Sequence, residues 1–139
     1  MSSALDRLKN LTSKISSYEL TRKQNMAQLR VLFEELHIND KVENFEALFN
    51  FKAINLSGVS LQQETLGEIK EGKYLQILAI SYDKNAAKKS TNISLGYFGR
   101  VERVEPQLRQ KVIAFVLRYR FEKSFLTLEH YNEMLENLE

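Results

Sequence analysis

Residues 74–82 read Tyr74-Leu75-Gln76-Ile77-Leu78-Ala79-Ile80-Ser81-Tyr82, a run rich in residues that favour β-strands. The run is apolar on both faces, which is typical of a strand in the middle of a sheet. A second strand is predicted over 92–98, where Ile93, Leu95 and Tyr97 lie on one face. The polar segment 83–90 has the character of a hairpin loop, and residues 53–56 could form a further brief strand. We therefore expect a short antiparallel sheet.

Helices are predicted both before and after these strands along the sequence. Pro106 suits the first turn of a helix that runs to about Lys123, and its segment 112–117 is apolar all round, so we expect it to be buried across the sheet. Residues 124–127 are read as a joint before a last helix, which should expose its glutamates and bury Tyr131, Met134, Leu135 and Leu138. Two shorter helices are predicted over 41–51 and 61–70.

The first 38 residues carry the pattern of a long amphipathic helix, or of two in tandem. They contain no Gly or Pro from Ser3 onward, and a heptad frame from Leu5 to Leu36 is apolar except at Thr12, Glu19 and Arg22. The predicted fold class is therefore α+β: a long, coiled-coil-like N-terminal helix followed by a small domain with a short antiparallel sheet packed against helices. The predicted division is residues 1–39, an oligomerisation segment, and residues 40–139, an α+β domain.

An amphipathic helix of this kind can bind a partner protein or a second copy of the chain, or it can pack along its own domain. We favour the first reading. The residues predicted to make the contact are the apolar ones of the heptad frame, namely Leu5, Leu8, Ile15, Met26, Leu29, Phe33 and Leu36.

The charge is unevenly distributed along the chain. Residues 81–125 hold ten basic and four acidic groups, whereas residues 126–139 hold four glutamates and no Lys or Arg. Two readings follow: the basic and acidic pieces match each other, or the basic piece binds a polyanion such as nucleic acid. The candidate polyanion-binding residues are Lys84, Lys88, Lys89, Arg100, Arg103, Arg118, Arg120 and Lys123.

The composition argues against catalysis. The chain has no cysteine, which removes thiolate metal sites and cysteine nucleophiles, and it has only two histidines, His37 and His130. The zinc-protease, nucleophile-elbow and P-loop motifs do not occur in the sequence. We therefore predict a protein that is not an enzyme and that uses no cofactor and no metal.

What remains is a binding protein. We expect a non-enzymatic protein–protein interaction module, such as an adaptor, chaperone, inhibitor or assembly factor, that acts through the N-terminal helix and a basic surface. The alternative is a nucleic-acid-binding regulatory protein that uses residues 84–123. The longest wholly apolar stretch is residues 112–117, far short of a membrane span, so we expect a cytoplasmic protein without a membrane partner.

Overall fold

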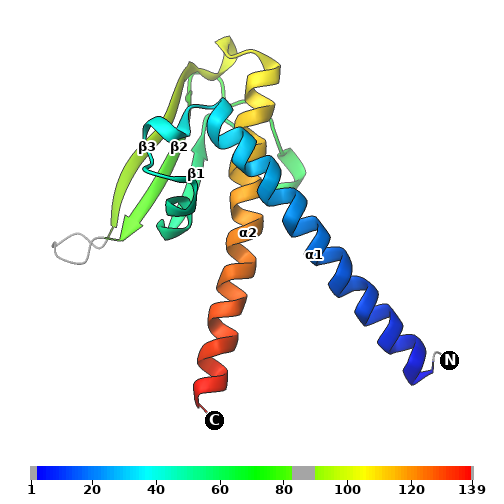
Figure 1. Cartoon of the computed structure of the whole chain (residues 1–139). Helices are drawn as coiled ribbons and strands as arrows, with labels where there is room; N and C mark the ends of the chain where they lie inside the picture. The colour runs from blue at the N-terminus through cyan, green and yellow to red at the C-terminus, as the bar shows by residue number, and fades with distance from the viewer. Residues whose placement is uncertain (1–2, 83–89, 139) are drawn as a thin grey trace.

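The computed structural model describes residues 3–82 and 90–138, with side chains for all of these except residues 11–17, 90 and 91. Two long helices and three strands make up the fold (Figure 1). They are α1 (Ala4–Glu35), β1 (Ala53–Ser57), β2 (Tyr74–Tyr82), β3 (Ser90–Arg100) and α2 (Pro106–Leu138).

The strands form one antiparallel sheet in the order β1-β2-β3. The predictions of a strand over 74–82 and of its central position are therefore confirmed. β1 pairs with β2 through Ile54 opposite Ala79, and β2 pairs with β3 through Leu78 opposite Ser94. The pairing of β2 with β3 shifts register twice, between Tyr74 and Gln76 and between Ile77 and Leu78, which bends this edge of the sheet.

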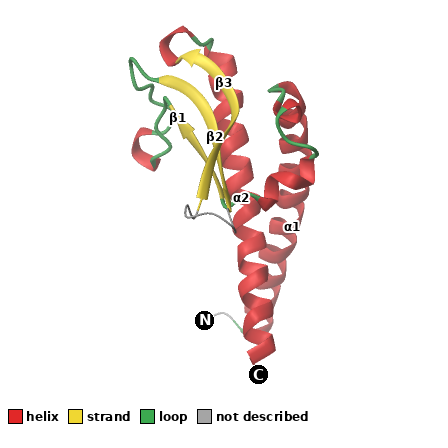
Figure 2. Ribbon diagram, turned by 90° about the vertical axis from the view of Figure 1, so that its left-hand side faces the viewer, coloured by secondary structure: helices red, strands yellow, loops and turns green. Residues whose placement is uncertain are grey.

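Helix α2 lies between the sheet and α1 (Figure 2). Its residues Val112, Phe115, Val116 and Tyr119 are fully buried among side chains from the sheet and from α1. The predicted burial of the 112–117 segment is confirmed at Val112, Ile113, Phe115 and Val116, but Ala114 is half-buried and Leu117 is exposed. Helix α2 is the element that joins the other two layers.

The expected arrangement, in which a long N-terminal helix precedes a separate small domain, is wrong. The side chains of α1 are described in two stretches, 4–10 and 18–35, and the second stretch is part of the core rather than separate from it. Leu29, Leu32, Phe33 and Leu36 belong to the same buried cluster as the sheet. The sheet and α2 cover this apolar face of α1, so the helix and the sheet share one core. The division of the chain at residue 39 stays a prediction.

The predicted joint at residues 124–127 is also wrong, because α2 continues through it to Leu138. Ser124 Oγ donates to the Arg120 carbonyl at 2.8 Å, and Thr127 Oγ1 donates to the Lys123 carbonyl at 2.9 Å. Both hydroxyls therefore bond back to the preceding turn of the same helix, which lets these residues lie inside it instead of capping a new one.

The two shorter helices are smaller than predicted. Between residues 41 and 51 the 3₁₀ helix Phe45–Asn50 forms in place of the longer helix. Asn44 caps its N-terminus by accepting from the Ala47 N–H at 2.9 Å. Between residues 61 and 70 a single 3₁₀ turn, Gln63–Thr65, forms. Gly67 has φ of 86° and donates its N–H to the Ser60 carbonyl at 2.9 Å, so the chain turns back there and cannot continue a helix.

Tyr119 makes the stability of the fold depend on pH in the alkaline range. Its hydroxyl donates to the Phe51 carbonyl at 3.2 Å, and burial raises the pKa of Tyr119 to about 12. From the unfolded pKa of about 10 up to that value, the unfolded chain loses this proton while the folded chain keeps it. The free energy of unfolding should therefore fall as pH rises from 10 to 12, and fall less steeply in Tyr119→Phe. Urea titrations of both proteins at pH 9, 10 and 11 measure the difference; parallel slopes would contradict it.

Candidate interaction surface

The residues predicted for protein interaction in α1 are divided by the structure. Leu29, Phe33 and Leu36 are buried in the core of the chain, and Met26 packs against that core. Leu5 and Leu8, by contrast, are about 60% exposed at the N-terminal end of the helix. Ile15 lies outside the described side chains. Among the described residues of this predicted surface, the exposed ones are therefore those at the N-terminal end of the helix.

The five predicted polyanion-binding residues that the structure describes do not gather in one place. Lys84, Lys88 and Lys89 lie outside the described residues. Arg100 is at the end of β3, where its Nη2 is 2.6 Å from Glu102 Oε1. Arg103 is exposed on the 3₁₀ helix Val101–Arg103 that follows.

The other three candidates lie on α2 and already donate hydrogen bonds within the chain. Arg118 Nη1 donates to Asn25 Oδ1 at 3.1 Å, on the side of α1. On the side of β1, Arg120 Nε donates to the Ile54 carbonyl at 3.2 Å and Lys123 Nζ donates to the Phe49 carbonyl at 2.8 Å. Burial lowers the pKa of Lys123. These three cations are therefore engaged in hydrogen bonds within the fold. Polyanion binding stays a prediction.

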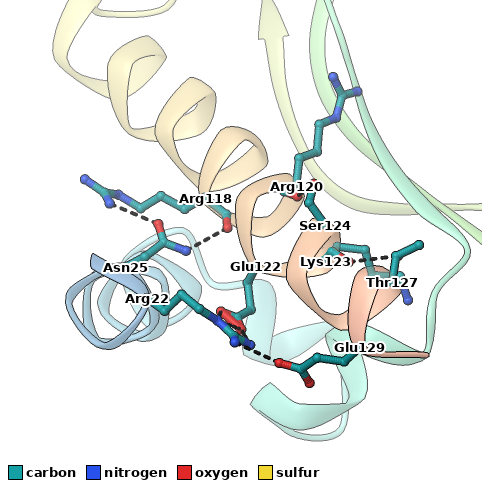
Figure 3. Close-up of polar contacts among 9 residues, drawn as sticks. All are labelled: Arg22, Asn25, Arg118, Arg120, Glu122, Lys123, Ser124, Thr127 and Glu129. Carbon is teal, nitrogen blue, oxygen red and sulfur yellow. Dashed lines mark hydrogen bonds and ion pairs between the residues drawn. The ribbon is translucent and has the colours of Figure 1, made fainter. Parts of the chain in front are cut away.

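An ion-pair cluster joins the two helices where they cross (Figure 3). Arg22 of α1 donates from Nε to Glu122 Oε1 at 3.1 Å and from Nη1 to Glu129 Oε1 at 2.8 Å. The hydrogen bond to Glu122 raises the pKa of the Arg22 guanidinium above its usual range, and the guanidinium carbon lies 4.6 Å from the centre of the Phe125 ring. The Glu122 side chain is only 5% exposed, so this arginine neutralises a buried charge.

A second polar contact lies one turn further along α1. Asn25 is buried, and its Nδ2 donates to the Arg118 carbonyl at 2.9 Å while its Oδ1 accepts from the Arg118 side chain (Figure 3). The side-chain amide therefore bonds to both the backbone and the side chain of one residue of α2. Together with the Arg22 cluster, it fixes the crossing of α1 on α2.

Beyond this crossing the two helices diverge toward the two chain termini, so that each ends in a projecting arm (Figure 1). We call residues 4–17 the α1 arm and residues 126–138 the α2 arm. The Tyr18 and Phe125 rings lie 6.0 Å apart between centroids and add an aromatic contact between the two helices next to the Arg22 cluster. Glu129, which is held by Arg22, shows which side of α2 faces α1 there.

The α2 arm has an acidic side and an apolar side. Glu133 and Glu136 follow Glu129 at steps of four and three residues, so all three lie on the side that faces α1. The apolar residues lie between about 100° and 180° around the helix from Glu129, by the helical repeat of 3.6 residues per turn. They are between 42% and 83% exposed: Leu128, Tyr131, Met134, Leu135 and Leu138.

The α1 arm also carries apolar and charged residues, with the opposite sign of charge. Its N-terminus is capped by Ser3, whose Oγ accepts from the Asp6 N–H at 3.1 Å. Leu5 and Leu8 are exposed on it, next to the exposed cations Arg7 and Lys9. Both arms therefore combine exposed leucines with charge, which is the composition of helix surfaces that pack on other helices.

A groove of about 620 Å³ lies between β1 and the start of the α2 arm. Lys52, Arg120 and Lys123 supply its cations, while Leu128 and Tyr131 bring the apolar side of the arm into its wall. The exposed apolar surface of the arm thus continues toward the sheet.

The α2 arm is the part of this surface that was not found by sequence reasoning. Its apolar residues were predicted to be buried, and that prediction is wrong for Tyr131, Met134, Leu135 and Leu138. The signal that could have found it is the spacing of residues 128, 131, 135 and 138. These steps of three and four residues form a helix-packing stripe on a segment rich in glutamate.

Comparison of the chain with protein-family models, with curated proteins and with solved structures finds no match. In the part of the chain that the structure describes, no helix is long and apolar enough to cross a membrane. The same described residues contain no group of three or more His, Asp or Glu side chains placed to hold a metal ion. The candidate site is therefore the pair of helical arms.

Proposed function

We propose that this chain is a non-enzymatic protein–protein interaction module that binds its partner through the α1 and α2 arms. The observation that carries the proposal is the exposed apolar side of the α2 arm, whose five large residues are all open to solvent on a helix that projects from the core. Contiguous exposed apolar surface of this kind is characteristic of sites where proteins bind one another.

The non-enzymatic part of the proposal rests on the sequence, which has no cysteine and none of the catalytic motifs sought in it. A cytoplasmic location is part of the same proposal, supported by a composition without disulfides, which suits a reducing compartment.

A photo-crosslinking amino acid placed in the full chain tests this function in the cells that carry the gene. With the crosslinker at Leu135, illumination should give adducts with protein, because this position lies on the exposed side of the α2 arm. The matched control is Tyr97, which is exposed on β3, away from the arms. Equal adduct yields from positions 135 and 97 would contradict the proposal.

A further inference from the structure

We propose that the partner of the α2 arm is a segment of another protein with carboxylates at one end and apolar residues over the rest. The carboxylates bind Arg120 and Lys123 in the groove beside β1, and the apolar residues pack along the arm. This inference rests on the proposed function and names the chemistry of its partner. Three observations carry it: the state of the groove cations, the side of α2 on which they lie, and the continuity of the groove with the arm.

The groove between β1 and the α2 arm contains cations and no acid. Lys52, Arg120 and Lys123 line it, and its other lining residues are neutral. Arg120 and Lys123 donate to backbone carbonyls, and Arg120 also donates to the Asn55 amide oxygen. Within the described part of the chain, no carboxylate forms a salt bridge with any of the three cations. The neutral acceptors hold these side chains in place but leave their positive charge without a counter-ion.

Both hydrogen-bonded cations keep donors for a ligand. A guanidinium and an ammonium each have more N–H donors than Arg120 and Lys123 use in these bonds. Burial lowers the pKa of Lys123, because the charged ammonium is partly removed from water. A carboxylate in the groove would accept hydrogen bonds from both side chains and would stabilise the charged form of Lys123.

The groove cations lie on the same side of α2 as the apolar residues of the arm. By the helical repeat of 3.6 residues per turn, Arg120, Tyr131, Leu135 and Leu138 lie within about 60° of one another around the helix axis. Glu129 lies about 180° from Arg120 by the same repeat, and Figure 3 shows the two side chains on different sides of the helix. A segment that covers the apolar residues is therefore in line with the cations and away from the acidic side.

Tyr131 joins the groove to the apolar side of the arm. It lines the groove, and together with Met134, Leu135 and Leu138 it also lines a second hollow further along the arm. From Arg120 to Leu138 this surface extends for about 27 Å along the helix axis. One segment lying along the arm can thus reach the cations with its carboxylates while its apolar residues cover the arm.

The shape and the charge of this surface favour a protein segment over other anions. Sites for small molecules enclose most of their ligand, but Leu128 and Tyr131 in the groove wall are 65% and 58% exposed, so the groove covers one side of its occupant. A nucleic acid strand carries a phosphate at every nucleotide, and beyond the groove these phosphates would lie against apolar residues, within the negative field of Glu133 and Glu136. In a protein segment the negative charges can be confined to one end.

Selection of peptides from a random display library on the full chain tests this preference. The peptides should be about 18 residues long, because a helix of that length covers the surface from Arg120 to Leu138. The selected peptides should carry Asp or Glu at one end and large apolar residues over the rest. One of them, labelled with fluorescein, then serves as the probe, and its Kd is measured by fluorescence anisotropy.

Loss of the groove cations should weaken binding of this probe. Lys52→Glu and Arg120→Gln/Lys123→Gln should each raise its Kd by about tenfold, because each removes attraction for the carboxylates. The Lys52 side chain is exposed, so its variant tests the groove even if the exchange of Arg120 and Lys123 disturbs the contact with β1. The matched control is Lys70→Glu, which makes the same change of charge at the other end of β1, where the Lys70 N–H donates to the Gly58 carbonyl. It should leave the Kd unchanged.

A spectroscopic measurement separates carboxylate binding from apolar contact alone. The pKa of Lys123, followed by NMR, should rise when the probe binds, since a carboxylate beside the ammonium favours its charged form. An unchanged pKa would overturn the proposal. Selected peptides without acidic residues would overturn it too, as would a Kd that responds equally to Lys52→Glu and Lys70→Glu.

Two other occupants give results of their own. Binding of fluorescein-labelled single-stranded DNA that is weakened by Lys52→Glu would assign the groove to nucleic acid and overturn the proposal. Adducts from the crosslinker at Leu135 to a second copy of this chain alone would assign the arm to self-association and overturn it as well. Adducts with a different protein, combined with peptides that lack acidic residues, would refute this inference and leave the proposed function standing. Equal adduct yields from positions 135 and 97 would refute both.

Discussion

Val116→Asp should leave the chain unfolded. Val116 is 0% exposed and belongs to the apolar cluster that α2 shares with the sheet and α1. An aspartate there would bury a carboxylate among apolar side chains, at a cost of about 4 kcal/mol or more. That cost approaches the whole stability of a typical domain, which is about 5 to 15 kcal/mol. Loss of the far-UV circular dichroism signal of the helices and early elution on gel filtration would measure this result.

The neighbouring residue provides the control. Leu117 is 36% exposed on the same helix, so Leu117→Asp makes the same chemical change one position along, where water can solvate the carboxylate. We expect it to lower the free energy of unfolding by about 1 kcal/mol. If Val116→Asp folds as well as Leu117→Asp, then Val116 does not lie on the buried face of α2.

Arg22→Met should lower the free energy of unfolding by about 3 kcal/mol, because it leaves the Glu122 carboxylate buried without its cation. The double variant Arg22→Met/Glu122→Met removes both charges and should recover most of that loss. Urea unfolding of the two variants and of the unchanged chain gives the comparison.

An exposed ion pair between the same two helices is the control for Arg22. Lys111 Nζ is 3.1 Å from Glu35 Oε2, with both side chains open to water, so Lys111→Met should cost at most about 1 kcal/mol. A cost for Arg22→Met no larger than that for Lys111→Met would show that the buried pair does not hold the helices together.

The sheet was predictable because its signal is local. Residues 74–82 are apolar on both faces, and a strand of that kind needs a neighbour on each edge and a cover on at least one face. The apolar centre of α2 is equally local, since residues 112–117 have no polar side to expose. In both cases the pattern within one segment is enough to determine where the segment lies.

The helix crossing was not predictable in the same way. A heptad frame treats Arg22 as a break in an apolar seam, yet in the structure Arg22 and Asn25 are central to the contact with α2. Their partners, Glu122 and Arg118, lie about 100 residues later in the chain, and a pattern within the first 38 residues contains no trace of them. Glu129 of the acidic piece 126–139 pairs with Arg22, which lies outside the basic piece 81–125, so neither reading of the charge predicts this contact.

Arg120 and Lys123 have a consequence for how the folded chain behaves at high concentration. An edge strand such as β1 presents unpaired backbone groups on which a strand of another molecule can assemble, which is a common route to aggregation. Arg120 already donates to the Ile54 carbonyl of this strand, and Lys123 donates to the carbonyl of Phe49 just before it. At the opposite edge, the two register shifts bend β3 away from the flat shape that strand addition requires. Both edges thus resist the addition of strands from other molecules, so the folded chain is protected against growth into larger sheets.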